Sequence, residues 1–553
     1  MKTSTANFQR LPETTADIIA YHERTKHRPG RYASGPHGLD WATQPNPFRR
    51  FTGAPLFRLP PSNQDQTPPA AALFGIATVA HQPLTLTTLG LFFELSMGLS
   101  ARKQISDSSW YLRINPSSGN LHPTEAYAVL PDFAGLPAGV YHYAPFEHAL
   151  EKRARWTQPA TSVAGEFYVG LTSIIWREAW KYGERAFRYC QHDAGHALAA
   201  IRFAAAAVGW RVQFVPDWSD ERLAKLLGLD RADDFENAER ETPELLIQVT
   251  TGVGVAEALL PIASTAVEWF GLANRLSDSH VEWPAIDEAV KASERIAISQ
   301  ESSQAGDRVD WPPPSPPVCN HSAGQLIRQR RSAVDFDGVT SITREKFVSI
   351  LDATLPRASA PPFDAWPFAP HLHLVVFVHR VIGLEPGLYL WLRAPADALE
   401  LRQAFSAKLK WEPVTDAGIA PPLYRLGGGD LRDFARTLSC QQDIAADGAF
   451  SLGMLARFEP VLRERGAAAY RELFWEAGMI GQVLYLAAEA AGVRGTGIGC
   501  YFDDVLHNAL GLTGHDWQSL YHFTIGAPVE DLRLRTAPPY AHLVREAGSK
   551  DLT

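Results

Sequence analysis

The chain has 553 residues, more than one ordinary hydrophobic core accommodates, so two domains are the first expectation. Charged residues make up 20% of it and hydrophobic residues 46%, and the net charge is -9, which excludes a basic field for nucleic acid. The four cysteines lack metal-ligand spacing, which argues against a zinc module or a disulfide framework. No signal-peptide core and no run of about 18 apolar residues is present, so we predict a cytoplasmic protein without a membrane span.

The first part of the chain changes composition near residue 70. Residues 1–70 are rich in Pro, Gly, Arg and His, which predicts an N-terminal arm rather than a core. Residues 71–290 are predicted to form the first domain. Its apolar run from Leu84 to Ser100 predicts a helix. Two buried strands are expected over residues 125–130 and 139–143.

A polar and proline-rich segment follows the first domain. Residues 291–322 contain Ser299–Gln304 and then Pro312–Pro317, a composition typical of an interdomain linker. Residues 323–553 are predicted to form the second domain. Its predicted elements include a helix over residues 323–331 and strands over residues 372–378 and 387–391.

A long alanine-rich helix is predicted from about Tyr182 to Val208, and one fixed offset, without a gap, aligns it and the segment after it with the second domain. The offset pairs Ala186, Arg188, Ala194, Gly195, Gly209 and Arg211 with Ala469, Arg471, Ala477, Gly478, Gly492 and Arg494. It also pairs Asp220, Leu223, Leu227, Gly228 and Leu229 with Asp503, Leu506, Leu510, Gly511 and Leu512. These pairings predict a tandem duplication of one α+β domain.

The segment Arg113–Pro123 lies between the first predicted helix and a strand. Its sequence combines small hydroxyls, a glycine and an asparagine between prolines, which predicts a loop that presents short donors to a phosphate or a flavin edge. The alternative is a loop that only caps the next element. With the following Thr124-Glu125-Ala126-Tyr127, it resembles the flavin-binding segment of the nitroreductase superfamily, most closely the SagB-type branch. That resemblance implies FMN contacts from Arg113, Pro116, Ser117, Ser118 and Asn120.

In that superfamily FMN sits at a dimer interface, and the resemblance implies that the two halves form an intramolecular pseudo-dimer. The second half supplies the parts that accompany the loop, which are Arg330, Arg331 and Ser332, then Gly497, Ile498 and Gly499 within a Gly-rich turn, and Arg533 with Arg535. The first half has Val212–Pro216 at the Gly-rich position, and the second half has Pro356–Pro362 in place of the loop. One composite FMN site and one degenerate site are therefore expected.

The chemistry of these residues suits the cofactor. Guanidinium groups donate paired hydrogen bonds to phosphate, and glycines allow close approach of the backbone to the flavin ring. Adjacent arginines on a solvated helix and an ordinary turn are the alternatives. The sequence departs from the family at Val334, where a further basic residue is often found.

The pair Lys181-Tyr182 resembles the Lys-Tyr motif that azoline dehydrogenases carry at the start of the long helix. Azole formation removes one C–H as a proton and another as hydride, so a base beside the flavin is needed. A lysine of depressed pKa, or a tyrosine that shares its proton, would serve; a solvated helix start is the alternative. The fixed offset places Glu464 and Arg465 at these positions in the second half.

His192 and His196 are spaced i, i+4 with Asp193 between them, a spacing that superficially matches a zinc helix. The zinc pattern needs a glutamate after the first histidine and a third ligand, and neither is evident. We therefore predict no metal site, and expect both histidines to serve packing or a polar network.

Together these features predict an FMN-dependent dehydrogenase or oxidase that acts on a heterocyclic, azoline-type substrate in natural-product biosynthesis. The substrate is expected to be a small molecule or a group on a peptide or carrier, with no nucleic-acid or membrane partner and with a further homo-oligomer left open. The first alternative is an NAD(P)H-dependent reductase of nitro, quinone or enone compounds, which would not need Lys181-Tyr182. The second is a flavin-free scaffold protein.

Overall fold

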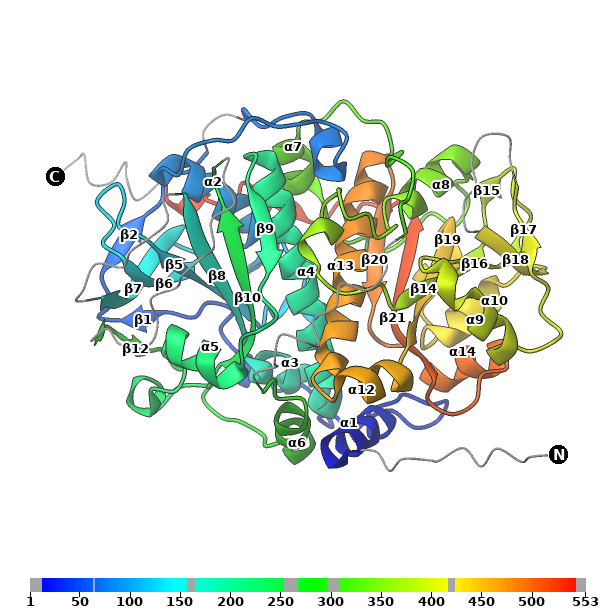
Figure 1. Cartoon of the computed structure of the whole chain (residues 1–553), viewed down its shortest axis with the longest axis horizontal. Helices are drawn as coiled ribbons and strands as arrows, with labels where there is room; N and C mark the ends of the chain where they lie inside the picture. Colours follow the sequence, from blue (N-terminus) through cyan, green and yellow to red (C-terminus); the bar gives the residue numbers. More distant parts are fainter. Residues whose placement is uncertain are drawn as a thin grey trace.

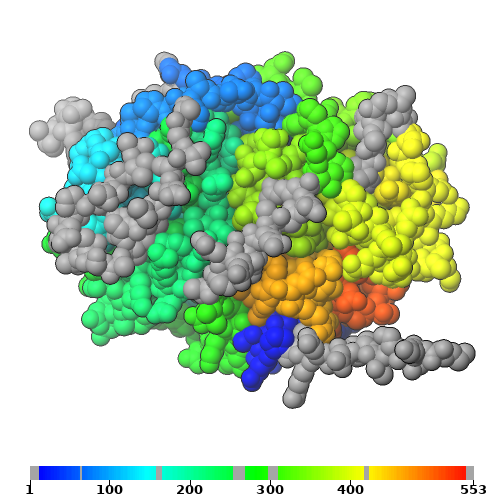
Figure 2. Space-filling model, in the orientation of Figure 1, coloured from blue at the N-terminus to red at the C-terminus, as the bar shows by residue number. Residues whose placement is uncertain are grey.

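A computed structural model describes residues 12–62, 65–156, 165–252, 267–296, 309–415 and 423–543, and every structural statement here refers to these residues. Each half of the chain forms an antiparallel sheet, and the long helices α4 and α13 run side by side between the two sheets (Figure 1). Helix α4 spans Ala186–Ala207 and α13 spans Ala469–Ala490. In the space-filling view the cyan and green atoms of the first half adjoin the yellow and orange atoms of the second (Figure 2).

The sheet of the first half has the strand order β11-β7-β6-β5-β8-β10-β9, with β2 also paired to β7. Its hydrophobic runs, such as Thr124–Leu130, are buried along their whole length, which explains why they read as continuous apolar strands. The strands are β2 (Leu56–Arg58), β5 (Thr124–Leu130), β6 (Gly139–Ala144), β7 (Ala149–Trp156), β8 (Glu166–Ser173), β9 (Arg211–Phe214), β10 (Thr242–Thr250) and β11 (Val267–Trp269).

The sheet of the second half repeats this arrangement in the order β17-β18-β16-β14-β19-β21-β20. In both sheets the strand after the long helix lies at an edge, next to the last long strand of its half. The strands are β14 (Leu372–Val378), β16 (Gly387–Trp391), β17 (Glu412–Pro413), β18 (Leu423–Gly428), β19 (Phe450–Arg457), β20 (Arg494–Ile498) and β21 (Trp517–Gly526).

The helices repeat with the offset found in the sequence. That offset maps the bounds of α4 onto those of α13, and those of α5 (Asp220–Leu227) onto those of α14 (Asp503–Leu510). The predicted tandem α+β fold is therefore confirmed. The other helices are α1 (Glu13–Arg24), α2 (Leu86–Ser96), α3 (Ile175–Tyr182), α6 (Pro284–Ala292), α7 (Ala323–Gln329), α8 (Arg344–Asp352), α9 (Ala398–Ala404), α10 (Arg432–Leu438), α11 (Ile444–Asp447) and α12 (Glu459–Arg465).

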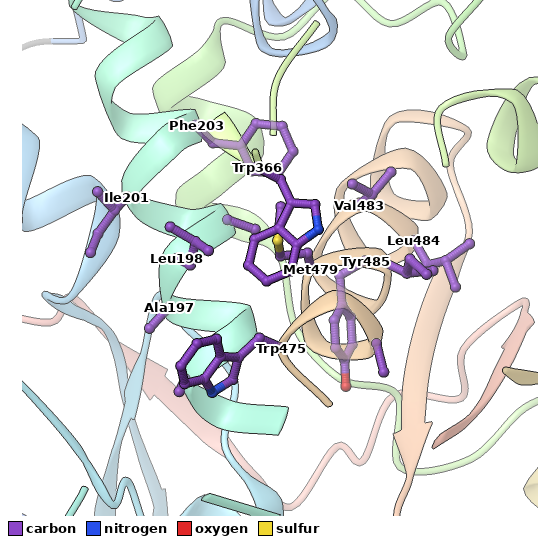
Figure 3. Close-up of a cluster of buried hydrophobic side chains, with 14 of the residues drawn as sticks. Ala197, Leu198, Ile201, Phe203, Trp366, Trp475, Met479, Val483, Leu484 and Tyr485 are labelled. Carbon is purple, nitrogen blue, oxygen red and sulfur yellow. The ribbon is translucent and has the colours of Figure 1, made fainter. Parts of the chain in front are cut away.

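Helices α4 and α13 cross at a pair of glycines related by the offset. A Cβ on Gly195 would lie 2.2 Å from the backbone oxygen of Trp475, and one on Gly478 would lie 2.2 Å from that of His192. Only glycine allows the two backbones to approach this closely. Around the crossing, side chains of α4 such as Leu198 face those of α13 such as Met479 in a shared core (Figure 3).

The two ends of the chain cross between the halves. Residues 535–537 form β22, which pairs with β3 (Leu99–Ile105), and β3 pairs in turn with β4 (Ser108–Arg113). At the other end α1 packs against α12 of the second half and against α6. The remaining short strands pair as β1 (Phe51–Thr52) with β12 (Leu272–Ala273), and β13 (Ile342–Thr343) with β15 (Val381–Ile382).

Several local predictions differ from the structure. The N-terminal segment contains a helix, α1, whose Ile18 and Tyr21 are buried in the core. The prediction of an arm outside the core was therefore wrong for this part of the segment. The helix expected over residues 84–100 ends at Ser96, and β3 begins three residues later. The long helix begins at Ala186 rather than near Tyr182, because Gly183 has a φ of +54° that interrupts the helix.

The predicted boundaries at residues 70, 290 and 322 stay predictions. The Ser299–Gln304 part of the predicted linker lies outside the described residues. Within the described ranges, we find no helix with both the length and the apolar character needed to cross a membrane.

Candidate functional site: a cavity between the two halves

A cavity of about 510 Å3 lies where the two halves meet. The first half contributes the loop after β4, and the second half contributes residues after α7 and strand β20. The structure thus brings most of the predicted composite site to one place. The predicted residues that line the cavity are Arg113, Pro116, Ser117, Ser118, Asn120, Tyr182, Arg330, Arg331, Ser332, Gly497, Ile498 and Gly499.

Hydrogen bonds made by side chains of the loop stabilise its conformation. Ser117 Oγ accepts from the His122 N–H at 2.8 Å, and Asn120 Nδ2 donates to the Tyr111 carbonyl at 3.0 Å. Gly119 has a φ of +62°, a left-handed conformation that favours glycine. The tight turn leaves the loop as one wall of the cavity.

Arg113 supports this loop as well as lining the cavity. The side chain is buried, donates to the Thr124 carbonyl at 3.3 Å and lies 3.9 Å from the Glu125 carboxylate. Burial lowers the pKa of Arg113 to about 10. Its contacts therefore tie the loop to β5 of the first half.

Positive charge gathers at one side of the cavity. Arg330 and Arg331 follow α7, where Ala333 N–H donates to the Gly495 carbonyl at 3.1 Å and fixes the segment against β20. Burial lowers the pKa of both guanidinium groups, that of Arg331 to about 10. The buried Nε of Arg330 has no hydrogen-bond partner among the described residues. Buried cations with an unused donor favour an anion as their ligand.

Lys103 and Arg494 add to this charge, and the sequence analysis did not assign either one to the site. Both line the cavity, and the positive charge of Arg331 helps burial to lower the pKa of Lys103. Arg494 was visible as one member of the repeat, directly before the Gly-rich run. No sequence pattern pointed to Lys103 as a site residue, because only the strand pairing of β3 brings it to the cavity.

The Gly-rich run forms strand β20 rather than the predicted turn. A Cβ on Gly497 would lie 1.9 Å from the Tyr521 hydroxyl oxygen, and a Cβ on Gly499 would lie 2.4 Å from the Tyr189 ring. These glycines therefore make room for two tyrosines of the protein, both of which line the cavity. The expected close approach of this backbone to a flavin stays a prediction.

Lys181 and Tyr182 lie at the end of α3, opposite the loop. A Cβ on Gly119 would lie 2.6 Å from the Tyr182 hydroxyl and 3.1 Å from Lys181 Nζ, so both polar atoms converge on this glycine. Lys181 Nζ is also 5.2 Å from the centre of the Tyr182 ring. Burial, reinforced by Glu178, raises the pKa of Tyr182, so its phenol keeps its proton.

Two buried carboxyl groups complete this end of the site. Asp193 of α4 accepts from the Ser118 N–H at 3.3 Å and lines the cavity, and Glu178 of α3 accepts from Ser117 Oγ at 3.3 Å. Burial raises the pKa of Asp193 to about 8, and burial together with the charge of Asp193 raises that of Glu178. The sequence analysis saw Asp193 only as the residue between two histidines.

The structure does not bring Arg533 and Arg535 to the cavity. They line a separate depression beside the β3–β4 turn, although Asp531 and Leu534 line the cavity itself. The Arg533 side chain is 78% exposed and forms an ion pair with Asp531 at 2.8 Å. Their predicted contact with FMN therefore has no support from this arrangement and stays a prediction.

His192 and His196 face the second half. His192 Nε2 lies 3.0 Å from the Leu520 carbonyl oxygen, and His196 Nε2 lies 3.2 Å from the Tyr521 hydroxyl. They thus belong to a polar network between the halves. No group of three or more His, Cys, Asp or Glu side chains able to hold a metal ion occurs among the described residues.

Comparison with known proteins points to the nitroreductase family. The model of the nitroreductase family matches residues 327–527. The nitroreductase-like protein MJ1384 of Methanocaldococcus jannaschii is 26% identical over 155 residues, which are 26% of this chain and 75% of that protein. The trifolitoxin-processing protein TfxB of Rhizobium leguminosarum bv. trifolii is 30% identical over 148 residues, which are 24% of this chain and 33% of TfxB.

Among solved structures, a nitroreductase-type protein of Anabaena variabilis superposes with a TM-score of 0.67 and 22% sequence identity. The match covers 93% of this chain and 99% of that one, so the tandem arrangement has a counterpart of the same fold. The family match supports an oxidoreductase. Residues 327–527 therefore carry a nitroreductase-family domain, and the chain as a whole has the fold of the Anabaena variabilis protein.

The donor set fits the FMN that this family generally binds. Arg330, Arg331 and Ser332 offer donors to a phosphate, while the loop and the β20 backbone offer polar groups to a ring system. The clearest sign of a phosphate site is the buried Arg330 Nε, which has no hydrogen-bond partner among the described residues. A phosphate oxygen would supply the missing acceptor.

Proposed function

We propose that the chain binds FMN in this cavity and removes two electrons from an azoline-type heterocycle in natural-product biosynthesis. The observation that carries the proposal is the convergence of Lys181 Nζ and the Tyr182 hydroxyl on Gly119; Gly119 and Tyr182 line the cavity, and Lys181 lies next to them. A simple nitro or quinone reductase has no need for such a pair. FMN, when bound, supplies the hydride acceptor for this chemistry.

The residues of the chain divide the proton transfer between them. Tyr182 keeps its proton because burial raises its pKa, so in the resting site it donates a hydrogen bond to the substrate heterocycle. Lys181 is the group that accepts the substrate proton. Asp193 and Glu178 contact the loop, and burial raises the pKa of both carboxyl groups, which limits the negative charge around the lysine.

The assignment to natural-product biosynthesis is supported by the sequence similarity to TfxB, a protein named for the processing of trifolitoxin. Because the matched region is 33% of TfxB, activity and partners are not transferred from the whole of that protein. We propose a substrate presented on a peptide or carrier, or as a free small molecule, and a cytoplasmic site of action.

The first experiment is to identify and count the flavin in the purified protein. One FMN per chain is expected, because only one set of loop, arginines and Gly-rich strand is complete. Two FMN per chain would contradict the single site. No FMN after reconstitution would favour a flavin-free scaffold.

The second experiment compares oxidation of azoline substrates with oxidation of NADH or NADPH in the presence of nitro, quinone or enone acceptors. Azoline oxidation that is lost in Lys181→Ala supports the proposal. Turnover of NAD(P)H that is unchanged by Lys181→Ala would instead support the reductase, which the similarity to MJ1384 also favours.

A further inference from the structure

Two of the four cysteines meet at the edge of the cavity. Cys440 follows helix α10, and Cys500 follows strand β20 and lines the cavity. The Phe502 N–H donates to the Leu438 carbonyl at 2.8 Å. Gln442 Nε2 donates to the Cys500 carbonyl at 3.0 Å and to the Ser439 carbonyl at 2.7 Å. These bonds bracket the two cysteines, so the turn at 438–442 is held against residues 500–502.

The backbone of the first turn is unusual. Cys440 and Gln441 have φ values of +55° and +62°, which non-glycine residues rarely adopt. Such a conformation persists where surrounding contacts hold it. The same turn brings the Cys440 thiol close enough to that of Cys500 for each to shift the pKa of the other.

Cys500 also has a positive environment. The Ala33 N–H donates to His27 Nδ1 at 3.0 Å, which leaves Nε2 to carry the ring proton, and His27 lies close enough to Cys500 to lower the pKa of that thiol. Arg185 donates to the Gly499 carbonyl at 3.2 Å, next to the thiol. Cys440, then His27 and Arg185, lower the pKa of Cys500 to about 5, against the opposite effect of burial.

Other ionisable groups around the pair do not cancel this environment. Asp503 is engaged by Arg185 at 3.1 Å and by Arg188 at 2.8 Å. Tyr189 and Tyr501 have pKa values raised by burial, so both phenols stay neutral. Tyr32 of the N-terminal segment lies near the pair, and burial together with the two cysteines raises its pKa.

We propose that Cys440 and Cys500 form a dithiol site that exchanges with disulfides entering the cavity, Cys500 being the nucleophile and Cys440 the resolving thiol. The Cys500 thiolate attacks one sulfur of the disulfide and releases the first thiol. Cys440 loses its proton and attacks the Cys500 sulfur, which releases the second thiol and forms the Cys440–Cys500 bond. The entering disulfide gains the two electrons that the cysteines lose. This chemistry needs no flavin and stands apart from the proposed azoline oxidation.

The proposal is tested on the purified full chain with dipyridyl disulfide, by following pyridinethione release and mapping peptides without reduction. Two pyridinethiones are expected for the pair, with a crosslink between the peptides of Cys440 and Cys500 and no adduct on either. Cys319, a free and partly buried cysteine, provides the internal comparison, since a single thiol keeps its adduct. Stable adducts on both cysteines, or modification of Cys500 no faster than that of Cys319, would overturn the proposal.

Two variants assign the roles. Cys440→Ser is expected to release one pyridinethione at this site and to keep the adduct on Cys500. Cys500→Ser is expected to slow modification of Cys440 about tenfold or more, because the favoured thiolate is gone. Equal rates at Cys440 with and without Cys500 would refute the assignment of the nucleophile. The wild-type peptide map decides the proposal even where a variant folds poorly.

Discussion

The duplicated halves offer two related positions for a site, and only one of them is open. The offset that relates the halves pairs Gly497 with Phe214, His192 with Trp475, and Tyr182 with Arg465. At the second position the Phe214 ring lies 5.7 Å from the Trp366 ring and 5.9 Å from the Trp475 ring. The Arg465 guanidinium lies 3.7 Å from the centre of the Phe368 ring. Aromatic packing thus occupies the place that corresponds to the cavity.

The difference shows how duplication changes a symmetric site. Two identical subunits must keep every part at both positions, whereas a fused pair can keep the loop in one half and the arginines with the Gly-rich strand in the other. The position left over is then free to become core, as Phe214 and Trp475 have done. The predictions below test whether the open position serves catalysis and the position filled by aromatic residues contributes to the stability of the fold.

The largest effect is expected from Lys181→Ala. Removing the proposed proton acceptor should lower azoline oxidation about 100-fold or more and leave FMN content unchanged, since general-base catalysis commonly contributes a factor of this size. Steady-state turnover and the flavin absorbance of the same preparation measure both. Glu464→Ala, at the related exposed position of the second half, is the matched control and should retain activity. Normal turnover in Lys181→Ala would remove the proposed role.

Phe214→Ala should act on stability rather than on the cofactor. Removing a buried ring that packs between two tryptophans should lower the free energy of unfolding by about 3–5 kcal/mol, while the FMN content stays at one per chain. Denaturant unfolding and flavin counting measure the two quantities. A second FMN bound by this variant would show that the related position is a blocked cofactor site.

Arg331→Ala should weaken FMN binding about 10- to 100-fold, because a charge-assisted hydrogen bond contributes roughly 1.5–3 kcal/mol. Titration of the flavin-free protein with FMN, followed by fluorescence quenching, gives the dissociation constants. Arg533→Ala sharpens the comparison, since that side chain is exposed and paired with Asp531. An equal loss of affinity in Arg533→Ala would restore the role that the sequence predicted for Arg533.

The smallest expected effect is the pH dependence of the free energy of unfolding that Asp193 causes. An unfolded aspartate titrates near about pH 4, whereas burial raises the pKa of Asp193 to about 8, so the folded chain holds a proton that the unfolded chain has lost. Stability from this group is complete below the unfolded pKa and is lost as the pH rises through the folded one. A rise of one pH unit in this window should lower the free energy of unfolding by at most about 1.4 kcal/mol. Asp193→Asn should flatten this dependence, measured by urea unfolding at constant salt; an unchanged slope would contradict it.

Much of the architecture could be read from the sequence because it depends on local patterns. The strand at Leu372–Val378 is apolar except for His373, and the repeat predicted both long helices and the helices after them. Helix ends were less predictable. Gly183 breaks the long helix because its positive φ lets the chain pass close to Ser34, a contact between distant segments that no local pattern records.

For the site, the sequence by itself determined which residue types were present and which half carried each of them: the Pro-Ser-Ser loop and Lys181-Tyr182 in one, Arg330-Arg331-Ser332 and the Gly-rich strand in the other. Only the tertiary structure decided that Lys103 and Arg494 join them and that Arg533 does not. It also decided the meeting of Cys440 with Cys500, and the filling of the related position by Phe214. The physical reason is that these outcomes depend on burial and on contacts between segments far apart in the chain, whereas motifs and repeats are properties of neighbouring residues.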